Sequence, residues 1–199
     1  MRTLLALAAF TAFATAAQAE TKPVVVELFT SLACSSCPPA DALLQRLSKQ
    51  PGILPLSFDV TYWNGPAFRD PYALKAATDR QAWYASLVHS EQVYTPEAVV
   101  DGSAQLVGSH AAEIDAAIAA SRAAHAAAVP VSVSGGKMIT ITVQAGAGSG
   151  AELWLFGYDP KHTTAIGGGE NGGASITEVN VVRSVTDLGG WTGQGMTMT

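Results

Sequence analysis

The sequence has few cysteines and few histidines, and this shortage excludes most metal sites. It contains 2 cysteines and 4 histidines among 199 residues. A structural zinc site needs four ligands, usually from a second Cys-x-x-Cys or a closely spaced His pair. The histidines are scattered, at His89, His110, His125 and His162. We therefore expect no metal site and no cofactor. Metal binding by the two thiols alone, copper included, stays a minor alternative that no Met or His cluster supports.

Positive charge is also scarce. Lysine and arginine total 11 against 16 aspartates and glutamates, which gives a formal net charge of −5 at pH 7. Nucleic acids and anionic membranes attract basic surfaces, so neither is an expected partner. Beyond the N-terminal region no stretch is apolar and long enough to span a bilayer, so no membrane span is expected. The oligomeric state stays open.

The N-terminal segment has the layout of a secretory signal peptide. Met1-Arg2-Thr3 precedes an apolar run over Leu4–Ala16, and Ala17-Gln18-Ala19 forms an A-x-A cleavage site before Glu20. We expect residues 1–19 to be removed after Ala19 and the mature protein to be periplasmic or secreted. Disulfides persist in such compartments, so a cysteine pair there spends time oxidised.

Both cysteines lie in one motif, Cys34-Ser35-Ser36-Cys37-Pro38-Pro39, between an apolar run and an amphipathic stretch. A cysteine at the start of a helix lies near unpaired backbone N–H groups and the positive end of the helix dipole, which favour its thiolate. Cys34 is therefore the candidate nucleophile. Cys37, on the same side, is the candidate resolving thiol. An inert structural disulfide is the main alternative.

The first half of the chain alternates between predicted strands and helices. β-branched and apolar runs predict strands, and leucines or alanines at helical spacing predict helices. The predicted elements are a strand at Val24–Phe29, a helix at Ala40–Lys49, a strand at Ile53–Val60, a helix at Asp70–His89, a hairpin of Ala98–Val100 with Gln105–Val107, and a helix at Ala111–Ala128.

From Val129 onward the pattern becomes that of short strands separated by glycine-rich turns, with Ala145–Gly150 as a flexible loop. We expect a small all-β, sandwich-like domain here. The predicted organisation is thus a signal peptide over residues 1–19, an α/β domain over 20–128 and a β-rich domain over 129–199.

The order of elements, with Cys-x-x-Cys opening the first helix and Thr95-Pro96 directly before the third strand, resembles the thioredoxin fold. In that fold a cis-proline at this point faces the cysteine pair, and the backbone before it can pair with a bound peptide. The resemblance implies these roles for Thr95 and Pro96. The alternative is an ordinary trans-proline turn, because most X-Pro bonds are trans.

A closer resemblance rests on six short motifs spread over nearly the whole mature chain. They are Val26-Glu27-Leu28-Phe29-Thr30-Ser31, Cys34-Ser35-Ser36-Cys37-Pro38-Pro39-Ala40-Asp41, Tyr62-Trp63, Tyr94-Thr95-Pro96, Gly169-Glu170-Asn171 and Asn180-Val181-Val182-Arg183. Together they resemble a secreted bacterial thioredoxin-like family of unknown function, of the DUF1223 type. The resemblance implies a thioredoxin-like fold and an exported location, and it implies no particular reaction.

The chain departs from this family's pattern in three places. Where relatives often carry His and Asp before the Tyr-Trp pair, this chain has Asp59 and Thr61, so Asp59 either substitutes for the His or is solvated. Gly172-Gly173-Ala174 follows the Gly-Glu-Asn motif where arginine is usual. Relatives also continue through further strands, which leaves open that the last sheet, ending at Thr199, is incomplete.

Glu27 is the candidate proton shuttle for the cysteine pair. A carboxylate buried beneath a Cys-x-x-Cys has a raised pKa and can move the proton that Cys37 gains or loses. Thioredoxins usually place this acid six residues before the first cysteine, whereas Glu27 lies seven before Cys34, which on a regular strand points to the other face. A carboxylate paired elsewhere is therefore the alternative.

Three aromatic residues, Tyr62, Trp63 and Tyr94, are candidates for binding a substrate beside the cysteines, and Trp83 is a further groove candidate. Aromatic surface suits an unfolded peptide or an apolar ligand, although core packing is the commoner role of such residues. In the β-rich half we expect a polar network made of Glu170, Asn171, Asn180 and Arg183, for which buried hydrogen bonding and a ligand site are the two alternatives.

The sequence thus predicts an exported thiol–disulfide oxidoreductase that uses Cys34 and Cys37, with a protein or small-molecule thiol or disulfide as its substrate. The alternative is a non-enzymatic binding module of thioredoxin fold, in which the disulfide only fastens the turn. The residues Ser35 and Ser36 between the cysteines are neither bulky nor charged, so the direction of the reaction stays open.

Overall fold

The computed structural model describes residues 22–90, 92–124, 129–148 and 150–199. The predicted signal peptide and its cleavage site after Ala19 lie outside these residues. The elements, in chain order, are β1 (Val24–Thr30), α1 (Pro38–Leu47), β2 (Ile53–Asp59), α2 (Lys75–Leu87), β3 (Glu97–Val100), β4 (Ala104–Val107), α3 (Ala111–Ala124), β5 (Val131–Gly135), β6 (Ile139–Val143), β7 (Ala151–Ala165), β8 (Ser175–Trp191) and β9 (Met196–Met198).

The fold is mixed α/β and contains two sheets. The larger sheet has six strands in the order β4-β3-β1-β2-β8-β7, and the smaller has three in the order β5-β6-β9. In the larger sheet β1 is parallel to β2 and β2 is parallel to β8, while β3, β4 and β7 run antiparallel to their neighbours. All strand pairs of the smaller sheet are antiparallel.

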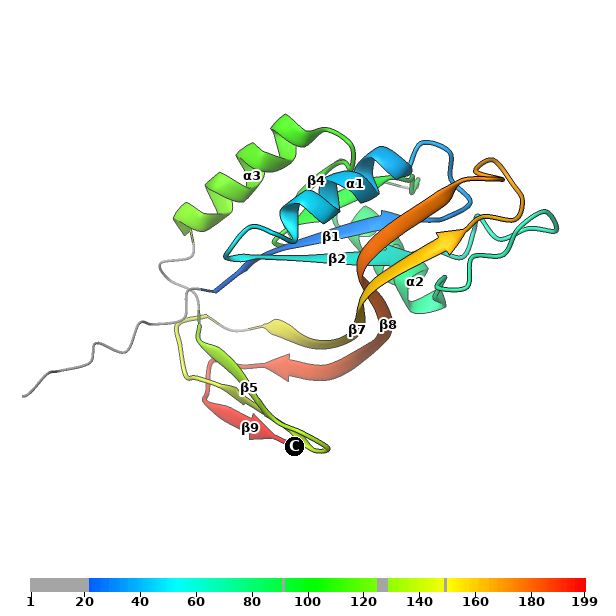
Figure 1. Ribbon diagram of the computed structural model, residues 1–199. Coiled ribbons are helices and arrows are strands. Elements are labelled where there is room, and N and C mark those ends of the chain that lie inside the picture. The colour runs from blue at the N-terminus through cyan, green and yellow to red at the C-terminus, as the bar shows by residue number, and fades with distance from the viewer. Residues whose placement is uncertain (1–21, 91, 125–128, 149) are drawn as a thin grey trace, which may run out of the picture.

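Helices cover both faces of the larger sheet around β1 (Figure 1). Alternate side chains of a strand point to opposite faces, and β1 carries apolar side chains on both, with Glu27 as its one charged residue. Val24, Val26 and Leu28 pack with α1 and α3, whereas Phe29 packs with Phe58 and with α2. The first strand and the region that follows it are therefore held between two cores.

Helix α2 begins at Lys75, five residues later than the Asp70 start predicted from the sequence. The carboxylate of Asp70 accepts a hydrogen bond from the backbone N–H of Tyr72, at 2.9 Å, and so closes a turn there. Such short polar side chains compete with the helix for backbone hydrogen bonds. Asp70 therefore belongs to the loop before α2.

The strands after residue 129 are divided between the two sheets: β5, β6 and β9 form the smaller sheet, whereas β7 and β8 belong to the larger one. Strands β7 and β8 make a long hairpin, and β8 joins the open edge of β2 through the pair Ser57 and Val181. Val181 and Val182 are fully buried there. The residues before Val129 thus form only part of the larger sheet. Without β8, the edge of β2 and the apolar side chains beside it would be uncovered. The predicted division into domains at residue 129 stays a prediction.

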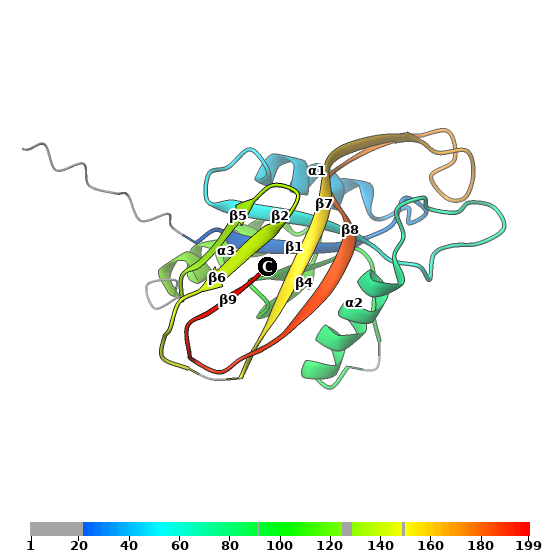
Figure 2. The same ribbon diagram turned by 90° about the horizontal axis from the view of Figure 1, so that it is seen from below.

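The far half of the hairpin bends away from the larger sheet and reaches the smaller one (Figures 1 and 2). The bend coincides with register shifts between Leu153 and Trp154 and between Gly157 and Tyr158, as is typical of β-bulges. Trp191, near the end of β8, packs against Ile141 and Val143 of β6. One hairpin thereby contributes to both cores.

None of the helices in the described ranges combines the length and apolar character needed to cross a membrane.

Candidate functional site: the Cys34–Cys37 disulfide

The two cysteines form a disulfide at the start of α1, with Cα atoms 5.4 Å apart. Helix α1 begins at Pro38, so Cys37 is its N-cap residue and Cys34 lies in the turn before it. The prolines at the first helical positions lack N–H groups that would have no partner there. The carbonyl of Cys37 accepts the N–H groups of Ala40 and Asp41 at 2.9 and 3.1 Å, which anchors the motif to the helix.

Both cysteines are completely buried, with 0% exposure, although Ser35 and Ser36 between them are exposed. The hydroxyl of Ser36 lies 3.3 Å from the Sγ of Cys34 and donates to the carbonyl of Thr95 at 3.4 Å. A reactant could reach the sulfur atoms only after the covering turn moves.

The predicted residues Thr95 and Pro96 lie at the cysteine pair. The peptide bond between them is cis, as the resemblance implies, and the Ser36 contact links it to the motif. The indole N–H of Trp63 donates to the Thr95 hydroxyl at 2.7 Å. Three predicted residues are therefore brought together beside the disulfide.

The predicted aromatic surface is divided between core and solvent. Trp63 is partly buried and packs on the core between β2 and α2. Tyr62 and Tyr94 are each 43% exposed, and both are tied to Gln81 of α2, which accepts the Tyr62 hydroxyl at 3.1 Å and donates to the Tyr94 carbonyl at 2.7 Å. Trp83 is also exposed. Tyr62 and Tyr94 thus remain available for a ligand.

Glu27 is not brought to the cysteines. It is buried on the face of β1 that α2 covers, whereas the cysteines open α1 on the other face. Its carboxylate accepts hydrogen bonds from the hydroxyl of Tyr84 at 2.7 Å and from Nη2 of Arg80 at 2.8 Å. Nε of Arg80 donates a further hydrogen bond to the same carboxylate. This is the alternative of a carboxylate paired elsewhere, and the geometry counts against a proton shuttle at Glu27.

A different set of buried acids lies beneath the motif, and only one of them, Asp59, was considered from the sequence. Its members are Asp41 of α1, Asp59 at the end of β2, Asp70 of the loop before α2 and Glu178 of β8, and each is at most 5% exposed. Asp59 is thus fully buried, not solvated. The four come from segments far apart in the chain, so no local pattern announces them.

Two of these acids, Asp59 and Glu178, depend on each other. No N–H or O–H group within the described ranges donates to any of their four carboxyl oxygens. The two carboxyl groups influence each other's titration, and a hydrogen bond between them would require a proton on one of them. Burial raises the pKa of Glu178 to about 7, and burial together with the charge of Glu178 raises the pKa of Asp59 well above its usual value. The pair therefore holds at least one proton at neutral pH.

Asp41 connects this pair to the motif. It lies one helical turn after Cys37, on the same side of α1, and its backbone N–H donates to the carbonyl of Cys37 at 3.1 Å. One carboxyl oxygen accepts a hydrogen bond from the hydroxyl of Thr30 at 2.9 Å, and the other has no hydrogen-bond partner among the residues that the structure describes. Burial, followed by the charge of Glu178, raises the pKa of Asp41 well above its usual value.

Asp70 holds the segment between β1 and the motif. Its Oδ2 accepts the backbone N–H of Leu32 at 2.8 Å and the hydroxyl of Ser31 at 3.2 Å. The N–H of Cys34 donates in turn to the carbonyl of Ser31 at 3.1 Å. The loop before α2 thus positions the turn that carries Cys34.

The tip of the β7–β8 hairpin reaches the motif from the other side. Asn171 donates from Nδ2 to the carbonyls of Leu32 and Cys34, each at 2.9 Å. Glu170 accepts a hydrogen bond from the backbone N–H of Ser35 at 3.1 Å, and hydrogen bonding from the Ser35 side chain, followed by this backbone bond, lowers the pKa of Glu170. Ile166 and Ile176, on either side of the tip, pack on Leu32.

The single polar network predicted for the β-rich half is wrong in its layout. Glu170 and Asn171 bind the cysteine motif, while Asn180, whose φ is 48°, donates to the carbonyl of Pro55 at 2.8 Å. Arg183 donates to the carbonyl of Tyr72 at 3.1 Å. The hairpin carries these residues on different sides, because it spans both the motif and β2.

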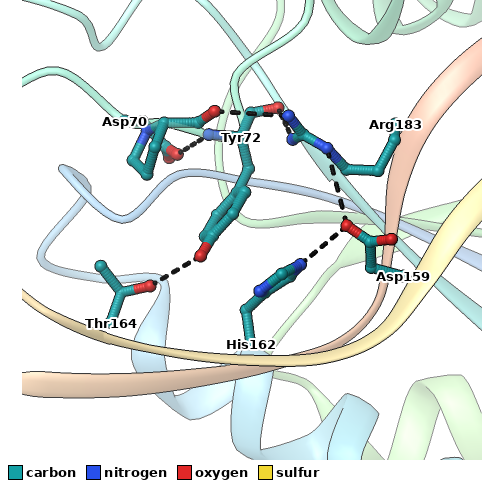
Figure 3. A network of polar contacts seen from close by, with 7 residues as sticks. Asp70, Tyr72, Asp159, His162, Thr164 and Arg183 are labelled. Carbon is teal, nitrogen blue, oxygen red and sulfur yellow. Dashed lines mark hydrogen bonds and ion pairs between the residues drawn. The ribbon is translucent and has the colours of Figure 1, made fainter.

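Figure 3 shows the network around Arg183. Its Nε lies 3.9 Å from Asp159, which also contacts Nε2 of His162 at 2.9 Å, and the His162 ring stacks on Tyr72 with centroids 4.4 Å apart. Because Tyr72 follows Asp70, this network fixes the loop that supports the cysteine turn.

Within the described part of the chain no group of three or more histidine, cysteine, aspartate or glutamate residues is arranged to hold a metal ion.

The comparisons with known proteins identify a family without an assigned activity. The family described as "Protein of unknown function (DUF1223)" matches residues 25–199. Among solved structures, a crystal structure of a protein from Agrobacterium tumefaciens, determined by a structural genomics consortium, is 31% identical, with a TM-score of 0.77. The match covers 90% of this chain and 78% of that one. No match is found among curated proteins. The chain therefore belongs to the DUF1223 family of proteins of unknown function.

Proposed function

We propose that this protein is an exported thiol–disulfide oxidoreductase that acts through Cys34 and Cys37. The observation that carries the proposal is the placement of its only two cysteines, which form a disulfide at the start of α1 beside Thr95 and Pro96. The thioredoxin-like relationship and the export suggested by residues 1–19 belong to this proposal. Tyr62 and Tyr94 would contact the substrate, since both are exposed near Thr95.

In the oxidising direction, a substrate thiolate attacks Sγ of Cys34 and the bond between the two cysteine sulfurs breaks. Sγ of Cys37 leaves with the electron pair and takes up a proton. A second substrate thiolate then attacks the substrate sulfur of the mixed disulfide, which releases Cys34 as a thiolate and the substrate as a disulfide. Reduction of a substrate is the reverse, with Cys34 attacking and Cys37 resolving.

The buried acids would supply and accept the proton of Cys37. Asp41 lies one turn from Cys37, and the pair formed by Asp59 and Glu178 holds a proton behind it. A carboxyl group is a better donor to a thiolate than bulk water, and its raised pKa brings it closer to that of a thiol. In this proposal the buried acids, and not Glu27, serve as the proton shuttle of Cys37.

The second candidate function is a non-enzymatic binding module in which the disulfide only fastens the turn. The observation that favours it is the complete burial of both cysteines, together with the hydrogen bonds that Asn171 and Asp70 make to the turn.

A redox titration separates the two. The full-length protein is equilibrated in mixtures of reduced and oxidised dithiothreitol, which is uncharged, and the fraction of reduced Cys34 and Cys37 is measured. An oxidoreductase is expected to have a potential above about −300 mV, whereas structural disulfides have potentials below about −300 mV. A value below that limit would contradict the proposed function.

A further inference from the structure

We propose that Glu170 selects substrates by charge, favouring thiols and disulfides with cationic or neutral surroundings and rejecting anionic ones such as glutathione. This inference rests on the proposed function and adds to it a substrate class. Polypeptide segments that carry lysine or arginine beside a cysteine are the substrates that such a site would accept best.

The position of the carboxylate is the first argument. Glu170 accepts the backbone N–H of Ser35, the residue directly after Cys34, at 3.1 Å. Of the side chains in the described residues that hydrogen-bond to the segment from Cys34 to Cys37, Glu170 is the one that carries a charge. Because Ser35 belongs to the exposed turn that covers Sγ of Cys34, this carboxylate lies at the turn that a reactant must displace, and its charge acts there over less than the Debye length at physiological salt.

The carboxylate is also held in place. The next residue, Asn171, donates to the carbonyls of Leu32 and Cys34, and the backbone of the tip is closed by hydrogen bonds between Ile166 and the residues Gly173 and Ala174. Gly168 lies so close to the carbonyl of Ala67 that a Cβ there would be 2.3 Å from its oxygen. The tip thus has little room to carry Glu170 away from the motif.

The charge is not neutralised locally. Glu170 is exposed, the bond from Ser35 favours its ionised form, and no basic side chain in the described ranges forms an ion pair with it. Arg69, which is exposed in the loop that contacts the tip, forms no such pair either. A fixed negative charge repels anions at close range and disfavours the Cys34 thiolate relative to the thiol.

Alkylation of the reduced protein tests the charge effect apart from any redox function. The reduced full-length protein reacts with iodoacetamide, which is neutral, and with iodoacetate, which is anionic, and the ratio of the two rate constants is measured at pH 7. Glu170→Gln keeps an oxygen that can accept the Ser35 N–H and removes the charge. The matched control is Glu152→Gln, at the opposite end of β7, where the side chain is also exposed.

We expect the ratio of neutral to anionic rate constants to fall about fivefold to tenfold in Glu170→Gln and to stay unchanged in Glu152→Gln, as removal of one nearby like charge implies. An unchanged ratio in Glu170→Gln, or an equal fall in the control, would overturn the inference.

The substrate class is tested with two disulfides, cystamine, which is cationic, and dithiodiglycolate, which is anionic. The reduced wild-type protein should react faster with cystamine, and Glu170→Gln should lose most of this preference. If neither disulfide reacts, the proposed function fails and the substrate class fails with it, even where the alkylation ratio falls as expected. If both react without a preference, the inference alone fails.

Discussion

Replacing Arg80 with alanine is expected to lower the free energy of unfolding by about 3–5 kcal/mol, as is typical when one partner of a buried ion pair is removed. The guanidinium binds the carboxylate of Glu27 through two nitrogen atoms, and both side chains are largely buried, at 11% and 4% exposure. Without Arg80, the hydroxyl of Tyr84 is the one hydrogen-bond donor that the described residues still offer to the Glu27 carboxylate.

Aromatic packing adds to this effect. The guanidinium carbon lies 4.9–6.0 Å from the ring centroids of Phe58, Trp83, Tyr84, Trp154 and Phe156. These rings come from β2, α2 and β7, so Arg80 joins the hairpin to the rest of the larger sheet. Its removal also leaves a cavity among the rings.

Urea unfolding of the oxidised protein measures the loss, and two comparisons make it specific. Lys75→Ala breaks an exposed ion pair with Asp79 and should cost less than about 1 kcal/mol. The double variant Glu27→Gln, Arg80→Met should lose less free energy of unfolding than Arg80→Ala, because it leaves no buried charge. A loss below 1 kcal/mol for Arg80→Ala would show that the pair is solvated. The redox potential should not change, since Arg80 and Glu27 lie on the far face from the cysteines.

The second large effect is on the pH dependence of stability. Because the pKa of Glu178 is raised to about 7 in the folded state, the folded protein keeps a proton that the unfolded chain releases near the ordinary glutamate value of about 4.3. Below both values the protonation states are equal. As pH rises from about 4.3 to about 7, the unfolded chain binds fewer protons, so the free energy of unfolding falls. At about 1.4 kcal/mol for each pH unit, the loss is about 4 kcal/mol, and it is complete above pH 7.

Glu178→Gln removes this contribution. Glutamine resembles the protonated acid and can donate a hydrogen bond to Asp59, but it does not titrate. The free energy of unfolding of the variant, relative to that of the wild type, should therefore increase by about 3 kcal/mol between pH 5 and pH 8. Urea unfolding across that range measures the difference, and Glu152→Gln, exposed on β7, is the control that should show none. Since Asp59 and Glu178 titrate as a pair, the midpoint of the change belongs to both. A pH-independent difference would contradict a protonated buried pair.

The sequence predicts those features of the fold that depend on residues close together in the chain, and it does not predict contacts between residues far apart in the chain. The strand before Cys34, the helix after Cys37 and the hairpin at Asp101-Gly102 are local patterns, and the structure has all three elements. The seven-residue spacing between Glu27 and Cys34 also indicated correctly that Glu27 faces away, because side chains alternate along a strand.

The contacts that the sequence did not predict are long-range. Glu178 is buried near Asp59 only because β8 joins β2, and the alternating pattern of β8 is equally consistent with a separate sheet. Glu170 and Ser35 are 135 residues apart, and a Gly-Glu-Asn motif does not say what it contacts. The hydrophobic pattern predicts a helix that begins at Asp70, because the turn-forming hydrogen bond from Tyr72 to Asp70 leaves no trace in that pattern.

The most direct test of the central claim is covalent trapping in the exporting cell. In Cys37→Ser the mixed disulfide formed by Cys34 cannot be resolved, so complexes with substrate should accumulate. After export and rapid acid quenching, non-reducing electrophoresis should show higher-mass species that a reductant releases. They should be absent when both Cys34 and Cys37 are replaced by serine. If Cys37→Ser is exported and folded, and its Cys34 is free to react with an alkylating agent, yet no such complexes form, the oxidoreductase account is contradicted.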